Sequence, residues 1–129
     1  MIIIGLNAYH GDSSACIIKD GRLIAAVEEE RFRRVKHWAG FPSEAIKYCL
    51  SEARVSISDV DFIAINRNPK AHLLRKAFYA LNGLSLKLII DRLKNAGKVQ
   101  SIKKIMASEL NVDENSIRAK VFNVEHHIA

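Results

Sequence analysis

The fold is decided by residues 1–37, which read MIIIGLN, AYHGDSSA, CIIKDGRLIAAV and EEERFRRVKH in order. Short apolar runs at 2–7, 14–19 and 22–28 have the length and composition of strands. Asp20-Gly21 separates the second and third runs, and this dipeptide favours a type I′ hairpin, in which both central residues need a positive φ. The stretch therefore predicts three neighbouring antiparallel strands, with a polar loop between the first two.

The third strand ends in a dense group of charged residues. Eight of the ten residues from Glu28 to His37 are charged or titratable. A charge run of mixed sign is usually a solvated face that neutralises itself. At the end of a buried hairpin, it also places charge beside the polar loop, so we consider it a candidate site.

The next segments predict a helix and two further strands. Residues 43–54 carry apolar side chains at helical spacing, and Ser43 or a neighbour is a candidate cap. Residues 61–66 form a buried strand that a helix separates from the earlier strands, so we expect it to run parallel to the first. A last strand at 119–124 extends the sheet in parallel. This α/β order is that of the opening half of a ribonuclease H-like domain.

Composition limits the protein to a few classes. The 129 residues suit one domain, and 49% hydrophobic with 26% charged residues is typical of a globular protein. No apolar run reaches the roughly 18 residues of a membrane helix, and the first strand lacks the features of a signal peptide. We therefore expect a cytoplasmic protein without a membrane partner. Cys16 and Cys49 have no metal-binding spacing and are expected to be buried thiols.

Residues 67–110 differ from the rest and predict a helical insertion of two or three helices. Ten Lys and Arg residues and a single acid, Asp91, lie between Arg67 and Lys104. A basic stripe is the expected footprint of a nucleic-acid interface. Aromatic residues are few there, only Phe78 and Tyr79, so we favour a solvated basic face that covers an acceptor substrate. The alternative is a basic ribonuclease H-like module that binds nucleic acid or regulates another protein.

The loop between the first two strands has residues suited to chemistry. Gly11, Ser13 and Ser14 are small and offer N–H and hydroxyl groups that suit phosphate oxygens. His10 and Asp12 suit the roles of general base, charge stabiliser or water-orienting group. The alternative is an ordinary polar hairpin loop.

Three segments together resemble a known family. GLNAYHGDSSA, AAVEEERFRRVKH with GFPSEAI, and EHHIA near residue 125 are similar to the start of the nodulation and antibiotic O-carbamoyltransferases. The resemblance covers residues 2–50 well and returns at 125–129. It implies the first lobe of an actin/Hsp70-like ATPase domain, related to the tRNA threonylcarbamoyl-transfer proteins, over residues 1–129. A second lobe and an adenylate-forming domain are then missing, so we expect these residues alone to be inactive.

The resemblance also implies a reaction and its participants. The family makes carbamoyl adenylate from carbamoyl phosphate and ATP, then transfers the carbamoyl group to a hydroxyl of a small-molecule or sugar acceptor. It implies that His10 and Asp12 are catalytic. The residues it implies for nucleotide or carbamoyl binding are Asn7, Gly11, Ser13, Ser14, Glu29, Glu30, Arg31, Lys36 and His37. Many superfamily members carry an acid where this chain has Asn7, which makes His10 the main side chain of the loop.

The resemblance implies a metal site at His126. In the family, this residue begins an H-H-x-A-H sequence, whose first and last His lie on one helical face and bind a divalent metal, iron or zinc. The last His would follow Ala129 directly, so the chain resembles a family member cut within its motif. On residue type alone, two adjacent histidines are more often exposed residues at a helix start.

Overall fold

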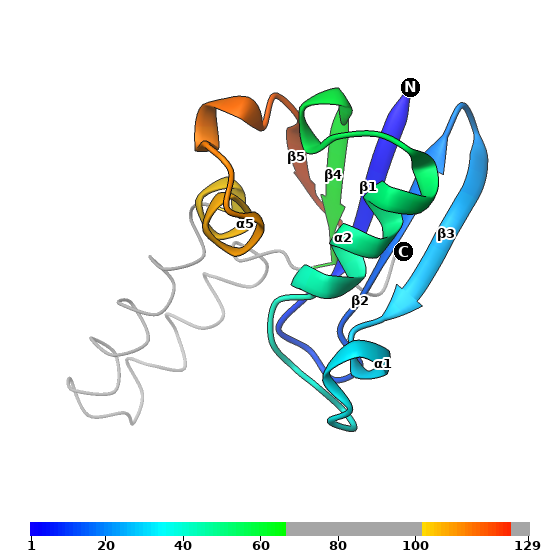
Figure 1. The fold of residues 1–129 in the computed structure, drawn as a ribbon, viewed down its shortest axis with the longest axis vertical. Helices are drawn as coiled ribbons and strands as arrows, with labels where there is room; N and C mark the ends of the chain where they lie inside the picture. The colour runs from blue at the N-terminus through cyan, green and yellow to red at the C-terminus, as the bar shows by residue number, and fades with distance from the viewer. Residues whose placement is uncertain (67–101, 125–129) are drawn as a thin grey trace, which may run out of the picture.

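Residues 1–66 and 102–124 are the part of the chain that the computed structural model describes. A mixed sheet of five strands in the order β3-β2-β1-β4-β5 organises this part (Figure 1). The strands and helices are β1 (Ile2–Asn7), β2 (Ser14–Lys19), β3 (Arg22–Glu28), α1 (Glu30–Arg33), α2 (Ser43–Ala53), β4 (Phe62–Ile65), α5 (Ile102–Leu110) and β5 (Lys120–Asn123), with 3₁₀ turns η1 (Ile57–Asp59) and η2 (Glu114–Ser116).

The strand pairing confirms the pattern expected from the sequence. β1 pairs antiparallel with β2, and β2 pairs antiparallel with β3. β4 lies parallel to β1, and β5 lies parallel to β4. Asp20 and Gly21 both have positive φ, 51° and 78°, as a type I′ hairpin requires. The predicted helix at 43–54 is confirmed as α2.

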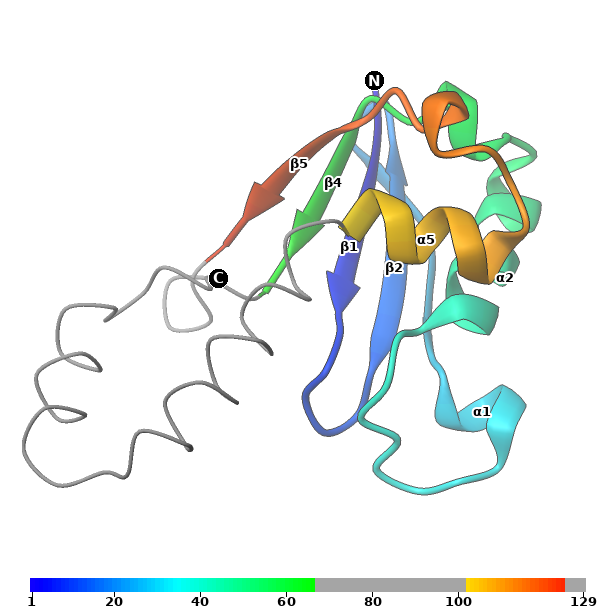
Figure 2. The ribbon, with the colours of Figure 1, turned by 90° about the vertical axis from the view of Figure 1, so that its left-hand side faces the viewer.

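Helices α2 and α5 cover one face of the sheet (Figure 2). The strands alternate, so Ile4, Ile17 and Ile63 point to these helices and are completely buried. Ile46 of α2 and Met106 of α5 are equally buried and complete the layer between helices and sheet. The same alternation turns the intervening strand residues toward the opposite face.

The segment predicted as a helical insertion is described only in part. Residues 67–101, which carry most of the basic residues, lie outside the described residues. Residues 102–110 form α5, whose Ile102, Met106 and Ala107 are buried in the core. Three predictions for this segment therefore stay untested: that it is a helical insertion, that it covers an acceptor substrate, and that it does not bind nucleic acid specifically.

The charged run 28–37, called the charged exit below, contains a short helix that the charge pattern did not predict. α1 spans only Glu30–Arg33 and ends at Arg34 in the left-handed conformation, with φ 55°. It lies at the same end of the sheet as the β1–β2 loop (Figures 1 and 2). Among the helices described, none has the length and apolar character to cross a membrane.

The two thiols should react at very different rates. Cys49 is fully buried in α2, as predicted, and burial raises the pKa of its thiol to about 11. The prediction that Cys16 is also buried is wrong, because Cys16 lies on the sheet face that the helices do not cover. Because thiolate is the reactive form, Cys49 should resist iodoacetamide at pH 8 while Cys16, which is partly exposed, is alkylated. Peptide mass spectrometry after timed alkylation measures both rates, and denaturant should make them converge. Equal rates in the native protein would contradict the packing of α2.

Candidate functional site

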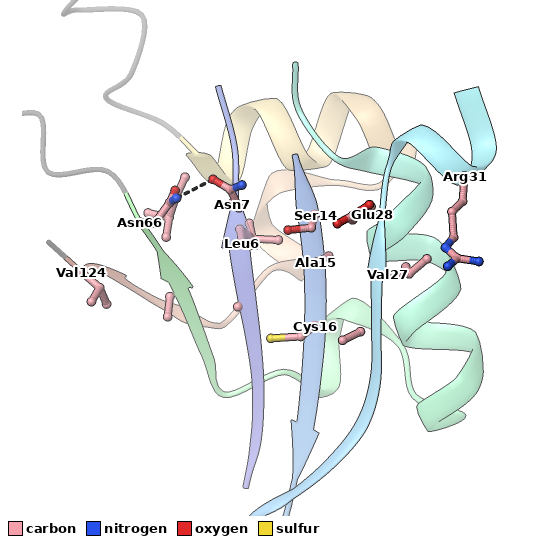
Figure 3. A pocket seen from close by; sticks show the side chains of 14 residues that line it. Leu6, Asn7, Ser14, Ala15, Cys16, Val27, Glu28, Arg31, Asn66 and Val124 are labelled. Atoms are coloured by element: carbon pink, nitrogen blue, oxygen red, sulfur yellow. Dashed lines mark hydrogen bonds between the residues drawn. The ribbon is translucent and has the colours of Figure 1, made fainter. Parts of the chain in front are cut away.

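A cavity of about 640 Å³ opens on the sheet face turned away from α2 and α5 (Figure 3). It lies where β1 and β4 end and β2 begins. The ends of β1 and β4 meet there because these two strands are parallel. Polar side chains line this end of the cavity, and apolar residues, several of them small, line the rest. The polar group is Asn7, Ser14, Glu28, Arg31 and Asn66, and the small group includes Gly5, Cys16, Ala26 and Ala64.

Small side chains keep the cavity open. Gly5 and Cys16 face each other across the β1–β2 pair. A Cβ atom added at Gly5 would lie 2.7 Å from Cys16 Sγ, which is closer than real Cβ contacts. Because Gly5 has no side chain, the Cys16 thiol fits beside it and the cavity next to both residues stays open.

Asn7 holds the β1–β2 loop, residues 8–13, from the end of its own strand. Its side-chain Nδ2 donates to the carbonyl oxygens of Gly11 at 3.3 Å and Asp12 at 2.9 Å. Its Oδ1 accepts a hydrogen bond from Asn66 Nδ2, and Figure 3 shows the two amides pointing at each other. The predicted binding residue Asn7 is thus on the cavity, with its amide used to shape the loop.

Ser13 fastens the loop to the turn at residues 38–41. Its Oγ lies 2.8 Å from Gly40 O and 3.2 Å from His10 O, and its N–H donates to Trp38 O at 2.9 Å. Tyr9 N–H donates to Gly40 O at 3.2 Å. Ser13 is buried, so this predicted phosphate ligand lies within the protein, whereas Ser14 lies on the cavity.

Glu29 is a fully buried carboxylate at the start of α2. Oε2 accepts from Ala45 N at 2.8 Å, and Oε1 accepts from Glu44 N at 3.2 Å and from Arg33 Nε at 2.7 Å. Its own N–H donates to Ser13 O at 2.8 Å. These contacts satisfy N–H groups that a helix start leaves without partners. The expected cap, Ser43, makes no such bond, and Glu29 replaces it from a distant position in the sequence.

Arg33 extends the Glu29 contact to the 38–41 turn. Its Nη2 donates to Ser43 Oγ at 2.9 Å, and its guanidinium carbon lies 4.6 Å from the centre of the Trp38 ring. The Trp38 ring in turn packs on Gly40, where a Cβ atom would lie 2.7 Å from the indole nitrogen. Arg33 belongs to the charged run taken as a candidate site but not to the residues that the resemblance implies for binding, and Trp38 was not predicted.

His37 and Asp12 bring the charged exit to the loop. His37 Nδ1 lies 2.8 Å from Asp12 Oδ1, and both side chains are more than half exposed. Both residues have a positive φ, 56° and 62°, which non-glycine residues adopt mainly where surrounding contacts impose it. Glu30 Oε2 accepts from His37 N at 3.4 Å. The structure thus joins three of the predicted site residues in one contact chain.

The loop tip is accessible from solvent. His10 and Gly11 are exposed, and a Cβ at Gly11 would meet nothing within 4 Å. Within the described residues, the N–H groups of Gly11 and Asp12 have no hydrogen-bond partner.

Lys36 is exposed and does not line the cavity.

Asn66 lines the cavity and was not predicted from the sequence, whereas Glu28 lines it as the first residue of the charged run. The sequence signal that could have identified Asn66 is its position as the first polar residue after the apolar run 62–65, which is expected to pair with the first strand. No group of three potential metal ligands occurs within residues 1–66 and 102–124. The expected ligand His126 lies outside these ranges.

The family comparison covers almost the whole chain. Residues 2–128 match the family described as Carbamoyltransferase N-terminus. The chain belongs to this family. Its loop and charged exit are therefore parts of a carbamoyltransferase N-terminal domain.

Two proteins with similar sequences come from Synechocystis and Sinorhizobium. An uncharacterized protein of Synechocystis sp. is 51% identical over 67 residues, covering 52% of this chain and 11% of that protein. The nodulation protein NolNO of Sinorhizobium fredii is 48% identical over 58 residues, covering 45% of this chain and 8% of NolNO. The chain thus spans about a tenth of the length of these two relatives.

Among solved structures, YeaZ from Pseudomonas aeruginosa aligns with a TM-score of 0.43 at 18% sequence identity. The alignment covers 95% of this chain and 42% of YeaZ. At that similarity we assign no fold from it.

Replacing Glu29 should lower the free energy of unfolding more than replacing an exposed carboxylate does. Glu29→Ala leaves Arg33 without its partner and the start of α2 without acceptors. Removing one partner of a buried pair costs about 3–5 kcal/mol, and we expect the lower end because Arg33 keeps 32% of its side chain exposed. Urea unfolding measures the loss. The control Glu52→Gln, exposed on the same helix, should change stability by less than about 0.5 kcal/mol. Equal effects would show that Glu29 does not hold α2.

Proposed function

We propose that the chain is the first lobe of the N-terminal domain of an O-carbamoyltransferase, which transfers a carbamoyl group to an acceptor hydroxyl. The observation that carries this proposal is the family match over residues 2–128. The order of three antiparallel and two parallel strands supports the finer assignment to a ribonuclease H-like lobe of an actin/Hsp70-like domain. We assign the second lobe and the adenylate-forming domain to sequence outside these residues, since the matched segments make up only 11% and 8% of the two relatives.

The loop tip suits the binding of an anionic donor. The N–H groups of Gly11 and Asp12 point to no acceptor within the described residues and are suited to phosphate oxygens. Arg31 lines the same cavity as Ser14, and a guanidinium pairs with phosphate or carboxylate oxygens through its planar fork. These features fit carbamoyl phosphate or carbamoyl adenylate, with ATP supplying the adenylate.

His10 is the group we assign to proton transfer. Its Nδ1 lies 3.4 Å from Gly11 O, and the tautomer that donates there has its lone pair on Nε2, where a general base needs it. The acceptor hydroxyl oxygen attacks the carbamoyl carbon, its proton passes to His10, and the phosphate-containing leaving group departs with the electrons of the broken bond. Asp12, held by His37, shapes the loop beside this base.

A bound divalent metal would supply positive charge near the transferring group. The described residues do not form a metal site by themselves, and Asn7 turns its amide nitrogen toward backbone carbonyls. We therefore propose that metal binding in the full-length protein depends on His126 and on ligands from the remaining chain, and we derive no step from it.

The His10→Asn variant tests the proposed function. Full-length protein is incubated with ATP, carbamoyl phosphate and hydroxylated acceptors, and mass spectrometry measures the carbamoylated product. Loss of a positioned general base should lower the rate about 10²–10⁴-fold, while thermal unfolding stays unchanged because His10 is exposed. A near wild-type rate with unchanged stability would make His10 a structural loop residue. No product from any acceptor with the wild-type protein would contradict carbamoyl transfer itself.

The metal assignment has an independent test. Elemental analysis after dialysis should find about one metal ion per full-length chain, less in His126→Ala, and none in residues 1–129 alone, because a transition metal usually needs three or more protein ligands. Metal retained equally by all three proteins would show that His126 is not a ligand.

A further inference from the structure

We propose that Asn66 is a positioning residue, which acts through Asn7 to fix the loop that carries His10 and Asp12. This inference rests on the proposed function for its catalytic consequence, while its structural part stands on the hydrogen bonds alone. Neither Asn66 nor its link to the loop follows from the family match. The link joins two strand ends that are adjacent in the sheet but 59 residues apart in sequence.

The orientation of both amides follows from their partners. Asn7 must place its NH₂ group toward Gly11 O and Asp12 O, since its oxygen would repel both carbonyls. Its Oδ1 then faces Asn66, and only the Asn66 NH₂ group can donate to it. A side chain without a donor at position 66 therefore cannot complete this arrangement.

The main chain places the two amides side by side. Leu6 pairs with Ile65 in the parallel β1–β4 ladder, and Asn66 N–H donates to Leu6 O at 3.1 Å. Both amide side chains lie on the same cavity. Asn66 Oδ1 is buried and has no partner within the described residues, so the pair with Asn7 is the polar contact that holds this side chain.

The consequence reaches the loop tip through two consecutive carbonyls. Gly11 O and Asp12 O follow His10 directly, so their bonds to Asn7 limit where the imidazole can lie. When Asn66 no longer donates, Asn7 is free to rotate and the loop loses both bonds. A shift of about 1 Å in a reacting group can lower a rate about 100-fold.

In the Asn66→Asp variant, pH determines whether the side chain at position 66 can donate a hydrogen bond to Asn7. The introduced carboxyl has almost the shape of the amide, and it donates to Asn7 Oδ1 only while protonated. As a carboxylate it accepts from Asn7 Nδ2 and draws that group away from the loop. Burial raises the pKa of such a carboxyl above its usual value of about 4, so protonation should occur in a measurable range.

The experiment compares full-length wild type, Asn66→Asp, Asn66→Leu and Asn123→Asp from pH 5 to 8. Asn123 ends the neighbouring strand β5 and is exposed, so its variant carries the same added charge without the amide pair. Transfer rates are expressed relative to wild type at the same pH, which cancels the titration of His10, Asp12, Glu28 and His37. Amide hydrogen exchange at Tyr9 and Ser13, which donate to the 38–41 turn, reports loop order without any reaction.

We expect the relative rate of Asn66→Asp to be about 10- to 100-fold low at pH 8 and to recover as pH falls. Asn66→Leu should be low at every pH, and Asn123→Asp should equal wild type. Relative to wild type at the same pH, exchange at Tyr9 and Ser13 should be faster in Asn66→Asp at pH 8 and should return to the wild-type rate at pH 5.

A relative rate for Asn66→Asp that does not change with pH would overturn the positioning role, whether it is high or low. If wild type transfers no carbamoyl group, the proposed function fails. Hydrogen exchange then decides the inference alone, and unchanged protection of Tyr9 and Ser13 in Asn66→Asp would overturn it.

Discussion

The buried Glu29 carboxylate is the interaction on which the rest of this lobe depends. It joins the end of β3 to the start of α2, pairs with Arg33, and belongs to a residue whose N–H binds the β1–β2 loop at Ser13. A carboxylate at a helix start is favoured by the unpaired N–H groups and by the helix dipole. One residue thus sets the relation of helix, charged exit and loop.

A site then arises from the direction of the strands. Because β1 and β4 are parallel, Asn7 and Asn66 meet at one end of the sheet, where the loop also leaves β1. The small residues Gly5 and Cys16 leave space on the open face beside them. The rigid sheet therefore holds the amide pair, and the amide pair holds the exposed loop tip. Such support is what a positioned catalytic group requires.

Local patterns predicted the sheet, its hairpin and α2, because alternation, turn residues and helical spacing are properties of short segments. The loop and the charged exit were also predicted as a candidate site, and the structure brings Asp12 and His37 together there. The roles of Glu29 and Asn66 were not predictable in this way. Glu29 is one of three consecutive glutamates, and only the packing of α2 distinguishes it from its neighbours. The role of Asn66 depends on its hydrogen bond to Asn7, which lies on a strand far away in the sequence.

Amide hydrogen exchange at Glu44 and Ala45 measures whether Glu29 caps α2 and thereby fixes the site. N–H groups in the first turn of a helix normally have no acceptor and exchange rapidly. In this lobe both donate to Glu29, at 3.2 Å and 2.8 Å. We predict slow exchange at both positions in the wild-type protein, comparable to the middle of α2. Exchange as fast as at an uncapped helix start would show that Glu29 does not cap α2.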